Sequence, residues 1–104
     1  MVWPPVSVKL VLVAAVLPAG SSAATSASFT LAGGQTMTLA GAARTAGGGS
    51  IYWRADVQRL MSDGAWETIG ALSWEAKMLT LYGDGEYRVH RPEGSGCMVD
   101  GALA

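Results

Sequence analysis

Apolar and other side chains alternate between residues 51 and 58. The apolar positions are Ile51, Trp53, Ala55 and Val57, and the intervening positions are Tyr52, Arg54, Asp56 and Gln58. A repeat of two residues is typical of a strand with one buried face, and aromatic and β-branched side chains suit a pleated surface. The pattern predicts a strand that begins near Ile51 and runs towards Leu60.

A turn follows this strand at Ser62-Asp63-Gly64. Glycine adopts the left-handed backbone conformation that the last residue of a three-residue hairpin loop requires. With this loop, apolar side chains lie opposite apolar ones and a positive side chain lies opposite a negative one. A two-residue loop at Asp63-Gly64 would instead place Leu60 opposite Glu67. We therefore predict the longer loop, with Val57 opposite Ile69, Arg59 opposite Glu67 and Leu60 opposite Trp66.

Gly83-Asp84-Gly85 repeats this pattern further along the chain. It predicts a second hairpin of the same kind, with a positive φ at Gly85 as at Gly64. The predicted pairs are Leu81 with Tyr87 and Leu79 with Val89 on one face, and Thr80 with Arg88 and Tyr82 with Glu86 on the other. Residues 72–76 would connect the two hairpins, with Trp74 packed inwards.

Shorter strands are expected on either side of these hairpins. Residues 27–31 and 35–39 flank Gly33-Gly34, and a turn there would place Phe29 opposite Met37. The Gly- and Ala-rich stretch 40–50 is typical of a loop. After a turn at residues 91–96, residues 97–99 form a short closing strand.

The first 26 residues have two interpretations. Val6, Val8, Leu10 and Leu12 alternate with other residues, which indicates an extended arm that buries these four side chains in an assembly interface. Alternatively, Lys9, the apolar run that follows it and the small residues 22–24 resemble a signal peptide covering residues 1–24. The residues alone leave both interpretations open, and we take the arm as the working hypothesis.

These patterns predict an all-β chain, with a single antiparallel β-sandwich or jelly-roll-like domain at residues 27–104 and an arm and linker at residues 1–26. The length of 104 residues allows one domain with a modest core. Fourteen glycines and a charged fraction of 14% suit turns and thin strands better than helices.

Charge and cysteine content narrow the classes of partner. The formal net charge is −1, so no basic patch predicts nucleic-acid binding. The N-terminal apolar run is too short to cross a membrane as a helix, so no membrane partner is expected. Cys97 is the only cysteine, which rules out an intramolecular disulfide and favours assembly in a reducing cytoplasm.

No group of residues indicates catalysis. His90, Cys97 and Asp100 are residue types of a nucleophilic triad, but no known local signature surrounds Cys97, and we expect a surface histidine and a packed cysteine. One histidine and one cysteine do not make the usual zinc set. We therefore predict no catalytic, cofactor-binding or metal-binding residue.

Two further constellations have simpler explanations. Glu67 and Glu75 could act as a glycosidase pair, but an ion pair between Glu67 and Arg59 across the predicted hairpin explains the first of them. Trp53, Trp66 and Trp74 could form a platform on which sugars stack, although such residues more often belong to a core. We expect core positions for these tryptophans.

The second half of the chain resembles a family of viral proteins. The relevant segments are Val57-Gln58-Arg59-Leu60, Asp63-Gly64-Ala65-Trp66-Glu67 with Ile69-Gly70, then Leu81, Gly83-Asp84-Gly85-Glu86-Tyr87-Arg88-Val89 and Arg91-Pro92. In sequence pattern over residues 29–102, they resemble the small β-sandwich virion accessory proteins of tailed bacteriophages: head decoration, spike-base or fibre-attachment proteins.

This resemblance implies a structural role without catalytic residues or cofactors. The expected protein is a homo-oligomer assembled in the host cytoplasm, which docks on capsid, neck or tail proteins and ends up in the virion. The alternative is an exported β-sandwich module, periplasmic or secreted, that binds a partner such as a carbohydrate and carries residues 1–24 as its signal peptide.

Overall fold

The structure, a computed structural model, describes residues 12–44 and 52–103 of the chain. This part is all-β and contains no helix. Its strands are β1 (Leu12–Gly20), β2 (Ala24–Thr25), β3 (Phe29–Leu31), β4 (Thr36–Ala43), β5 (Arg54–Leu60), β6 (Trp66–Ser73), β7 (Met78–Tyr82), β8 (Gly85–Arg91) and β9 (Cys97–Leu103).

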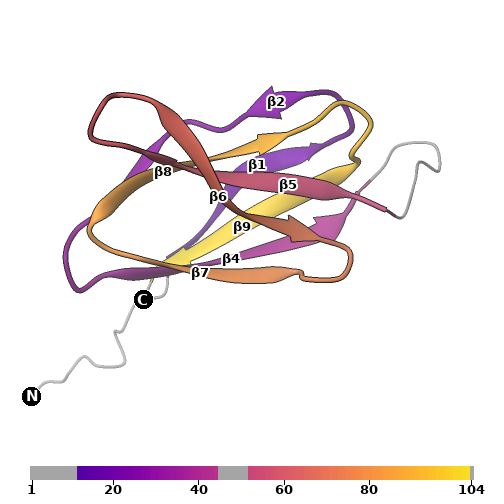
Figure 1. Ribbon diagram of the computed structural model, residues 1–104. Coiled ribbons are helices and arrows are strands. Elements are labelled where there is room, and N and C mark those ends of the chain that lie inside the picture. Colours follow the sequence, from indigo (N-terminus) through magenta and orange to yellow (C-terminus); the bar gives the residue numbers. More distant parts are fainter. Residues whose placement is uncertain (1–11, 45–51, 104) are drawn as a thin grey trace, which may run out of the picture.

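The strands form two antiparallel sheets that pack against each other (Figure 1). The first sheet has the order β1-β9-β4-β7. The second sheet has the order β2-β8-β5-β6, and β3 also pairs with β8. Sequence-adjacent strands β5 and β6 form a hairpin, whereas most other neighbours come from distant parts of the chain.

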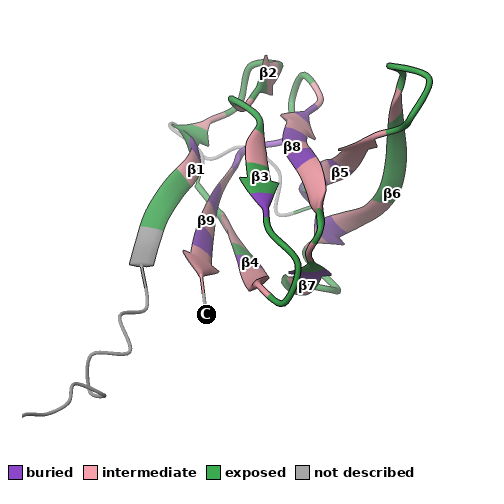
Figure 2. Cartoon of the chain, turned by 90° about the vertical axis from the view of Figure 1, so that its left-hand side faces the viewer, coloured by how far each residue is buried: buried purple, intermediate pink, exposed green. Residues whose placement is uncertain are grey.

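The core lies between the two sheets and takes every second residue of each inner strand. Figure 2 shows buried positions alternating with less buried ones along β8 and β9. The fully buried side chains include Leu39 and Val99 from the first sheet and Val57, Leu72 and Val89 from the second. Both sheets therefore contribute the same kind of inner face, as the alternating sequence pattern requires.

The first predicted hairpin is confirmed near its turn. Leu60 pairs with Trp66 and Arg59 pairs with Glu67, and Gly64 has a φ of 89°. The predicted pairing of Val57 with Ile69 is wrong, because a register shift after Val57 pairs that residue with Gly70. This bulge leaves Ile69 unpaired in the ladder, and its side chain is 48% exposed.

The second predicted hairpin is wrong. β7 pairs with β4 in the first sheet, whereas β8 pairs with β2, β3 and β5 in the second. Residues 83–85 carry the chain from one sheet to the other, and Gly85 is not among the glycines with positive φ. Leu79 and Leu81 still pack in the same core as Tyr87 and Val89, but from the opposite sheet.

The pairing predicted around Gly33-Gly34 fails for the same reason. The turn is present, because the Gln35 N–H donates to the Ala32 carbonyl at 3.0 Å and Gly34 has a φ of 87°. Phe29, however, pairs with Tyr87 in the second sheet, while Met37 pairs with Leu81 and Leu103 in the first. This turn too connects the two sheets.

The N-terminal region contributes strands to both sheets. β1 pairs with β9, and the short β2 pairs with β8, so residues 12–25 of the range predicted as arm and linker run along the sheets. Leu12 begins β1 opposite Leu103, and Val6, Val8 and Leu10 lie outside the described residues.

Two other segments are longer strands than the sequence pattern indicated. β4 continues to Ala43, into the stretch predicted as a loop. The predicted short strand at residues 97–99 is the seven-residue β9, which lies between β1 and β4. Small side chains at these positions pack closely in a sheet, so low volume did not mean a loop.

Candidate functional site

The outer face of the first sheet is almost uncharged. Residues directly opposite each other in an antiparallel pair point to the same face, and Leu39, Leu81 and Val99 mark the inner one. The outward positions are therefore Ala15 on β1, Met98, Asp100 and Ala102 on β9, Thr36, Thr38, Ala40 and Ala42 on β4, and Met78, Thr80 and Tyr82 on β7. Asp100 is the only charged residue of this set.

Large apolar side chains gather at the β7 edge of this face. Met78 is 66% exposed and pairs with Ala40, and Tyr82 is 65% exposed and pairs with Thr36. Between them, the hydroxyls of Thr38 and Thr80 approach to 3.5 Å. The face is thus built from small side chains beside two exposed large ones.

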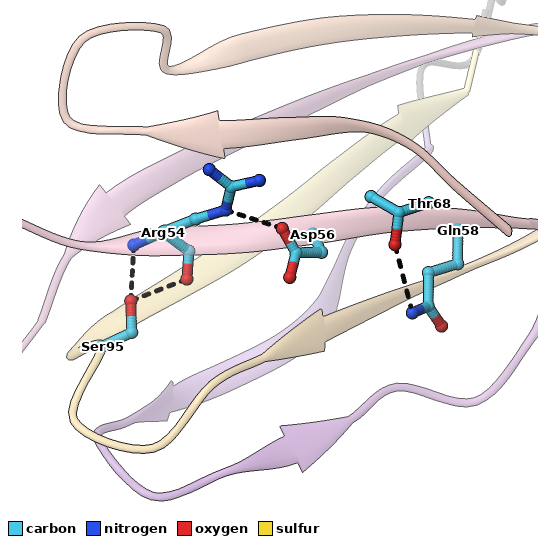
Figure 3. A network of polar contacts seen from close by, with 5 residues as sticks. All are labelled: Arg54, Asp56, Gln58, Thr68 and Ser95. Carbon is cyan, nitrogen blue, oxygen red and sulfur yellow. Dashed lines mark hydrogen bonds and ion pairs between the residues drawn. The ribbon is translucent and has the colours of Figure 1, made fainter.

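The outer face of the second sheet is charged, and its polar groups bond to one another (Figure 3). Arg54 Nε lies 2.7 Å from Asp56 Oδ1, which is the one ion pair within residues 12–44 and 52–103. Arg88 Nε donates to Gln58 Oε1 at 2.7 Å, and the Arg88 guanidinium lies 4.3 Å from the centre of the Trp66 ring. The side chains of this face therefore satisfy each other.

Ser95 fixes the connection between β8 and β9 to the start of β5. Its hydroxyl accepts a short hydrogen bond from the Arg54 N–H and donates to the Arg54 carbonyl at 2.6 Å (Figure 3). The turn itself forms as predicted, with the Ser95 N–H donating to the Pro92 carbonyl and a φ of 84° at Gly94.

Arg91 joins the two sheets from inside the molecule. It is 4% exposed, and its guanidinium donates to the carbonyls of Ser22 at 2.8 Å, Pro18 at 2.8 Å and Cys97 at 2.9 Å. No carboxylate of the described residues pairs with it. A buried cation held by main-chain acceptors of β1, β9 and the turn after β1 has a structural role.

The residue types of a nucleophilic triad are not brought together. Cys97 is buried on the inner side of the first sheet, and burial raises the pKa of its thiol while the nearby Arg91 acts in the opposite direction. Asp100 lies on the outer side of the same strand. His90 lies in the second sheet, where its Nδ1 is 2.9 Å from Thr25 Oγ1.

The expected ion pair of Arg59 with Glu67 does not form, although their backbones pair as predicted. The Arg59 guanidinium instead donates to the Asp84 carbonyl at 3.0 Å and lies 5.7 Å from the centre of the Tyr87 ring. Glu67 is exposed on β6, and Glu75 lies in the turn after that strand. Within the described part of the chain, no three His, Cys, Asp or Glu side chains gather as a metal site would require.

The three tryptophans occupy three different environments. Trp53 is a core residue at 2% exposure, as expected. Trp66 is half-buried under Arg88 and lies outside the core, and Trp74 is 44% exposed, so the prediction of core positions is wrong for both. Trp74 meets Tyr52 edge to face, with 4.9 Å between ring centres.

Trp53 and Trp74 nevertheless meet at one cleft, which the sequence did not reveal. The cleft has a volume of about 400 Å³ and is lined by Ala42, Ala43, Arg44, Trp53, Trp74 and Lys77. Its residues come from the end of β4 and from the segments that precede β5, follow β6 and precede β7. Three separate segments form it, since Trp74 and Lys77 share the connection between β6 and β7, so no local spacing in the sequence could have indicated it.

No protein-family profile, curated protein or solved structure matches this chain. The described residues include no helix of the length and apolar character that a membrane crossing needs.

Proposed function

We propose that this protein is a structural subunit of a tailed-phage virion. It docks on other capsid, neck or tail proteins as a decoration, spike-base or fibre-attachment subunit, and it assembles as a homo-oligomer. The sequence resemblance suggests this class, and the outer face of the first sheet is the observation that carries the docking role.

The strand order supports a jelly-roll form of the β-sandwich. The order β1-β9-β4-β7 opposite β2/β3-β8-β5-β6 places each strand as in an eight-stranded jelly roll, with β2 and β3 sharing one place. Viral capsid domains use this architecture, as do unrelated lectins and enzymes. The fold is compatible with a virion subunit, and the function has to be argued from the surface.

The outer face of the first sheet has the chemistry of a protein interface. The cores of interfaces are depleted in charged residues and enriched in tyrosine and methionine, as at Tyr82 and Met78. Each Å² of apolar surface removed from water contributes about 25 cal/mol to association. A flat, weakly polar protein surface is the partner that fits, because Asp100 is the only charge it would have to accommodate.

The outer edge of β1 supplies a second docking element. Among the described strands, β1 is an end strand of the first sheet, and strand edges bind further strands through their backbone groups. An apolar cleft of about 240 Å³ lies between this strand and the β2–β3 segment, with Val16, Phe29 and Met37 in its lining. The proposed assembly residues Val6, Val8 and Leu10 precede this edge in the sequence, and Leu12 begins it.

Co-expression with the remaining virion proteins tests this role. Thr38→Glu with Thr80→Glu places two charges on the outer face of the first sheet, and the expected result is loss of the protein from purified particles. Thr68→Glu on the second sheet is the matched control and should incorporate normally. Normal incorporation of the first variant, folded and at equal expression, contradicts docking through this face.

The arm is tested by removing residues 1–11. The truncation stops there because β1 starts at Leu12 and pairs with β9. Loss of incorporation from a folded, truncated chain is the expected result. Mass spectrometry of the native protein then separates the two interpretations of the N-terminus: a start at residue 1 or 2 supports the arm, and a start at residue 24 or 25 supports export.

A further inference from the structure

We propose that the cleft between Trp53 and Trp74 binds an acidic saccharide. The cleft lies at the end of the sandwich where β4 and β6 finish and β5 and β7 begin, on the right of Figure 1. This inference goes beyond the docking role, because it concerns a small-ligand site at the end of the sandwich.

One wall of the cleft is a positioned and accessible aromatic ring. Trp74 is 44% exposed, and its indole meets Tyr52 edge to face at an interplanar angle of 77°. The backbone N–H of Trp74 donates to the Trp53 carbonyl at 3.3 Å, which fixes the main chain that carries the ring. An indole face held in this way loses little conformational entropy when a ligand covers it. The C–H face of a sugar ring is a flat apolar surface that stacks on such a ring.

Trp53 forms the floor of the cleft because Gly41 has no side chain. A Cβ atom at Gly41 would lie 2.5 Å from Cη2 of Trp53, so only glycine lets the indole lie against β4. Trp53 is 2% exposed, so its ring is held in place by the core and contributes little accessible surface of its own to the cleft. A volume of about 400 Å³ above this floor is within the range of small-molecule sites.

Two cations, Arg44 and Lys77, also line the cleft, and no acidic residue is in its lining. Neither forms an ion pair with another described residue, and the Arg44 guanidinium donates to the Ala43 carbonyl at 2.7 Å. Their backbones are fixed, because the Arg44 N–H donates to the Gly96 carbonyl at 3.0 Å and the Lys77 carbonyl accepts the Gly41 N–H at 2.8 Å. A carboxylate on the ligand would pair with both cations, and guanidinium binds carboxylate through two parallel hydrogen bonds.

The exposed indole of Trp74 and the two cations together fit a sugar acid better than other anionic ligands. An acidic peptide would satisfy the cations but leave the indole face of Trp74 uncovered. A neutral sugar would cover the indole and leave Arg44 and Lys77 without a counter-charge. A uronic acid provides both a stacking face and a carboxylate in one residue, and a short oligomer of it extends past the cleft into solvent.

Titration of the full-length chain with trigalacturonate tests the proposal, with maltotriose as the neutral probe of equal length and triglutamate as the acidic peptide. The readouts are the indole N–H signals in a ¹H–¹⁵N spectrum and tryptophan fluorescence. We expect trigalacturonate to shift the Trp74 signal and leave Trp66 unaffected. Maltotriose and triglutamate should bind at least about tenfold more weakly, a difference of about 1.4 kcal/mol.

Three variants assign the binding to the two walls. Trp74→Ala should abolish binding, and Lys77→Gln should weaken it about tenfold, the loss of one charged contact. Trp66→Ala is the matched control, because Trp66 also lies beside an arginine but on the second sheet. The affinity of this variant for trigalacturonate should be unchanged. The exposed side chains of Trp74 and Lys77 make both variants compatible with folding, which thermal unfolding verifies.

Each other outcome overturns the proposal. Absence of a Trp74 shift with trigalacturonate shows that the cleft does not bind sugar acids. If maltotriose binds as tightly as trigalacturonate, the cations do not contribute to binding. If triglutamate binds as tightly as trigalacturonate, the cleft is an acidic-peptide site instead. Binding that survives Trp74→Ala places the ligand elsewhere. None of these results affects the incorporation test, so the two proposals fail separately.

Discussion

The two sheets have similar inner faces and opposite outer faces. Inside, leucine and valine from both sheets pack in one core. Outside, the second sheet carries arginine, aspartate and glutamine side chains that bond to one another, while the first carries threonine and alanine with Met78 and Tyr82 exposed. The same alternating pattern built both, and only the residues at the outward positions differ.

This contrast indicates which surface is available for association. Covering the second sheet would remove Arg54, Asp56 and Arg88 from water, and buried charges are costly unless every one is paired again. Covering the first sheet would desolvate methyl groups, the hydroxyls of Thr36, Thr38, Thr80 and Tyr82, and one carboxylate. The nearly uncharged outer face is therefore the one on which we expect the proposed partners to dock.

The contrast exists only while the sheets are held inner face to inner face, and buried Arg91 of β8 links them by its hydrogen bonds to β1 and β9. Arg91→Met keeps much of the side-chain length but leaves the carbonyls of Pro18, Ser22 and Cys97 without their donor. We expect a loss of about 3–5 kcal/mol in the free energy of unfolding, measured by urea denaturation.

Arg54→Met is the control for this prediction. Its side chain is 61% exposed and its ion pair with Asp56 lies on the outer face of the second sheet, so the expected loss is below about 1 kcal/mol. Equal effects of the two substitutions would show that Arg91 does not link the sheets.

The second prediction tests whether the inner faces of the two sheets contribute equally to one core. Leu39 in the first sheet and Leu72 in the second are both fully buried. Leu39→Ala and Leu72→Ala should each lower the unfolding free energy by about 2–5 kcal/mol, because each removes apolar contacts and leaves a cavity. Calorimetry should show a single transition in both variants. Two separate transitions, or a large effect in one sheet only, would contradict a shared core.

The sequence predicted local structure better than it predicted partners. Alternation located β5, and turn chemistry located the loop at residues 62–64 with its positive φ at Gly64. An alternating pattern predicts that a side chain is buried, but it does not predict to which sheet the strand belongs. The core contains both members of the pairs Leu79 and Val89, and Phe29 and Met37, and the pattern would be the same if each pair lay within one sheet. The two misassigned hairpins follow from that degeneracy.

The candidate sites show the same limit. The sequence correctly predicted that Arg59 lies opposite Glu67. The Arg59 guanidinium nevertheless donates to the Asp84 carbonyl, which lies in the connection where the chain passes from β7 in one sheet to β8 in the other. The cleft of Trp53 and Trp74 depends on Gly41 and Lys77, and only the pairing of β4 with β7 brings these segments together. Such sites follow from topology and not from spacing along the chain.

The third prediction compares a turn within one sheet with a turn between the sheets. Gly64 closes the β5–β6 hairpin, and Gly34 lies where the chain passes from β3 to β4; both have positive φ and open space around a Cβ atom. Gly64→Ala and Gly34→Ala should each cost about 1 kcal/mol, because the strain is local to the backbone. Gly33→Ala is the control, since Gly33 has equal space without a positive φ, and it should be neutral.

The smallest effect on stability is expected on the outer faces, and it tests the contrast between them most directly. Met78 and Ile69 are exposed apolar side chains on the first and second sheet respectively, so Met78→Lys and Ile69→Lys are a matched pair. Each should change the unfolding free energy by less than about 0.5 kcal/mol, as is usual for surface substitutions.

Association should nevertheless respond to only one member of this pair. A lysine at position 78 has to be desolvated when a second surface covers the first sheet, which opposes binding. A lysine at position 69 lies in the bulge of β6, at the end of the second sheet, and stays in water. Sedimentation velocity of the purified proteins should therefore show a shift towards monomer for Met78→Lys and none for Ile69→Lys. The same shift in both variants would mean that general charge repulsion, and not the first sheet, controls association.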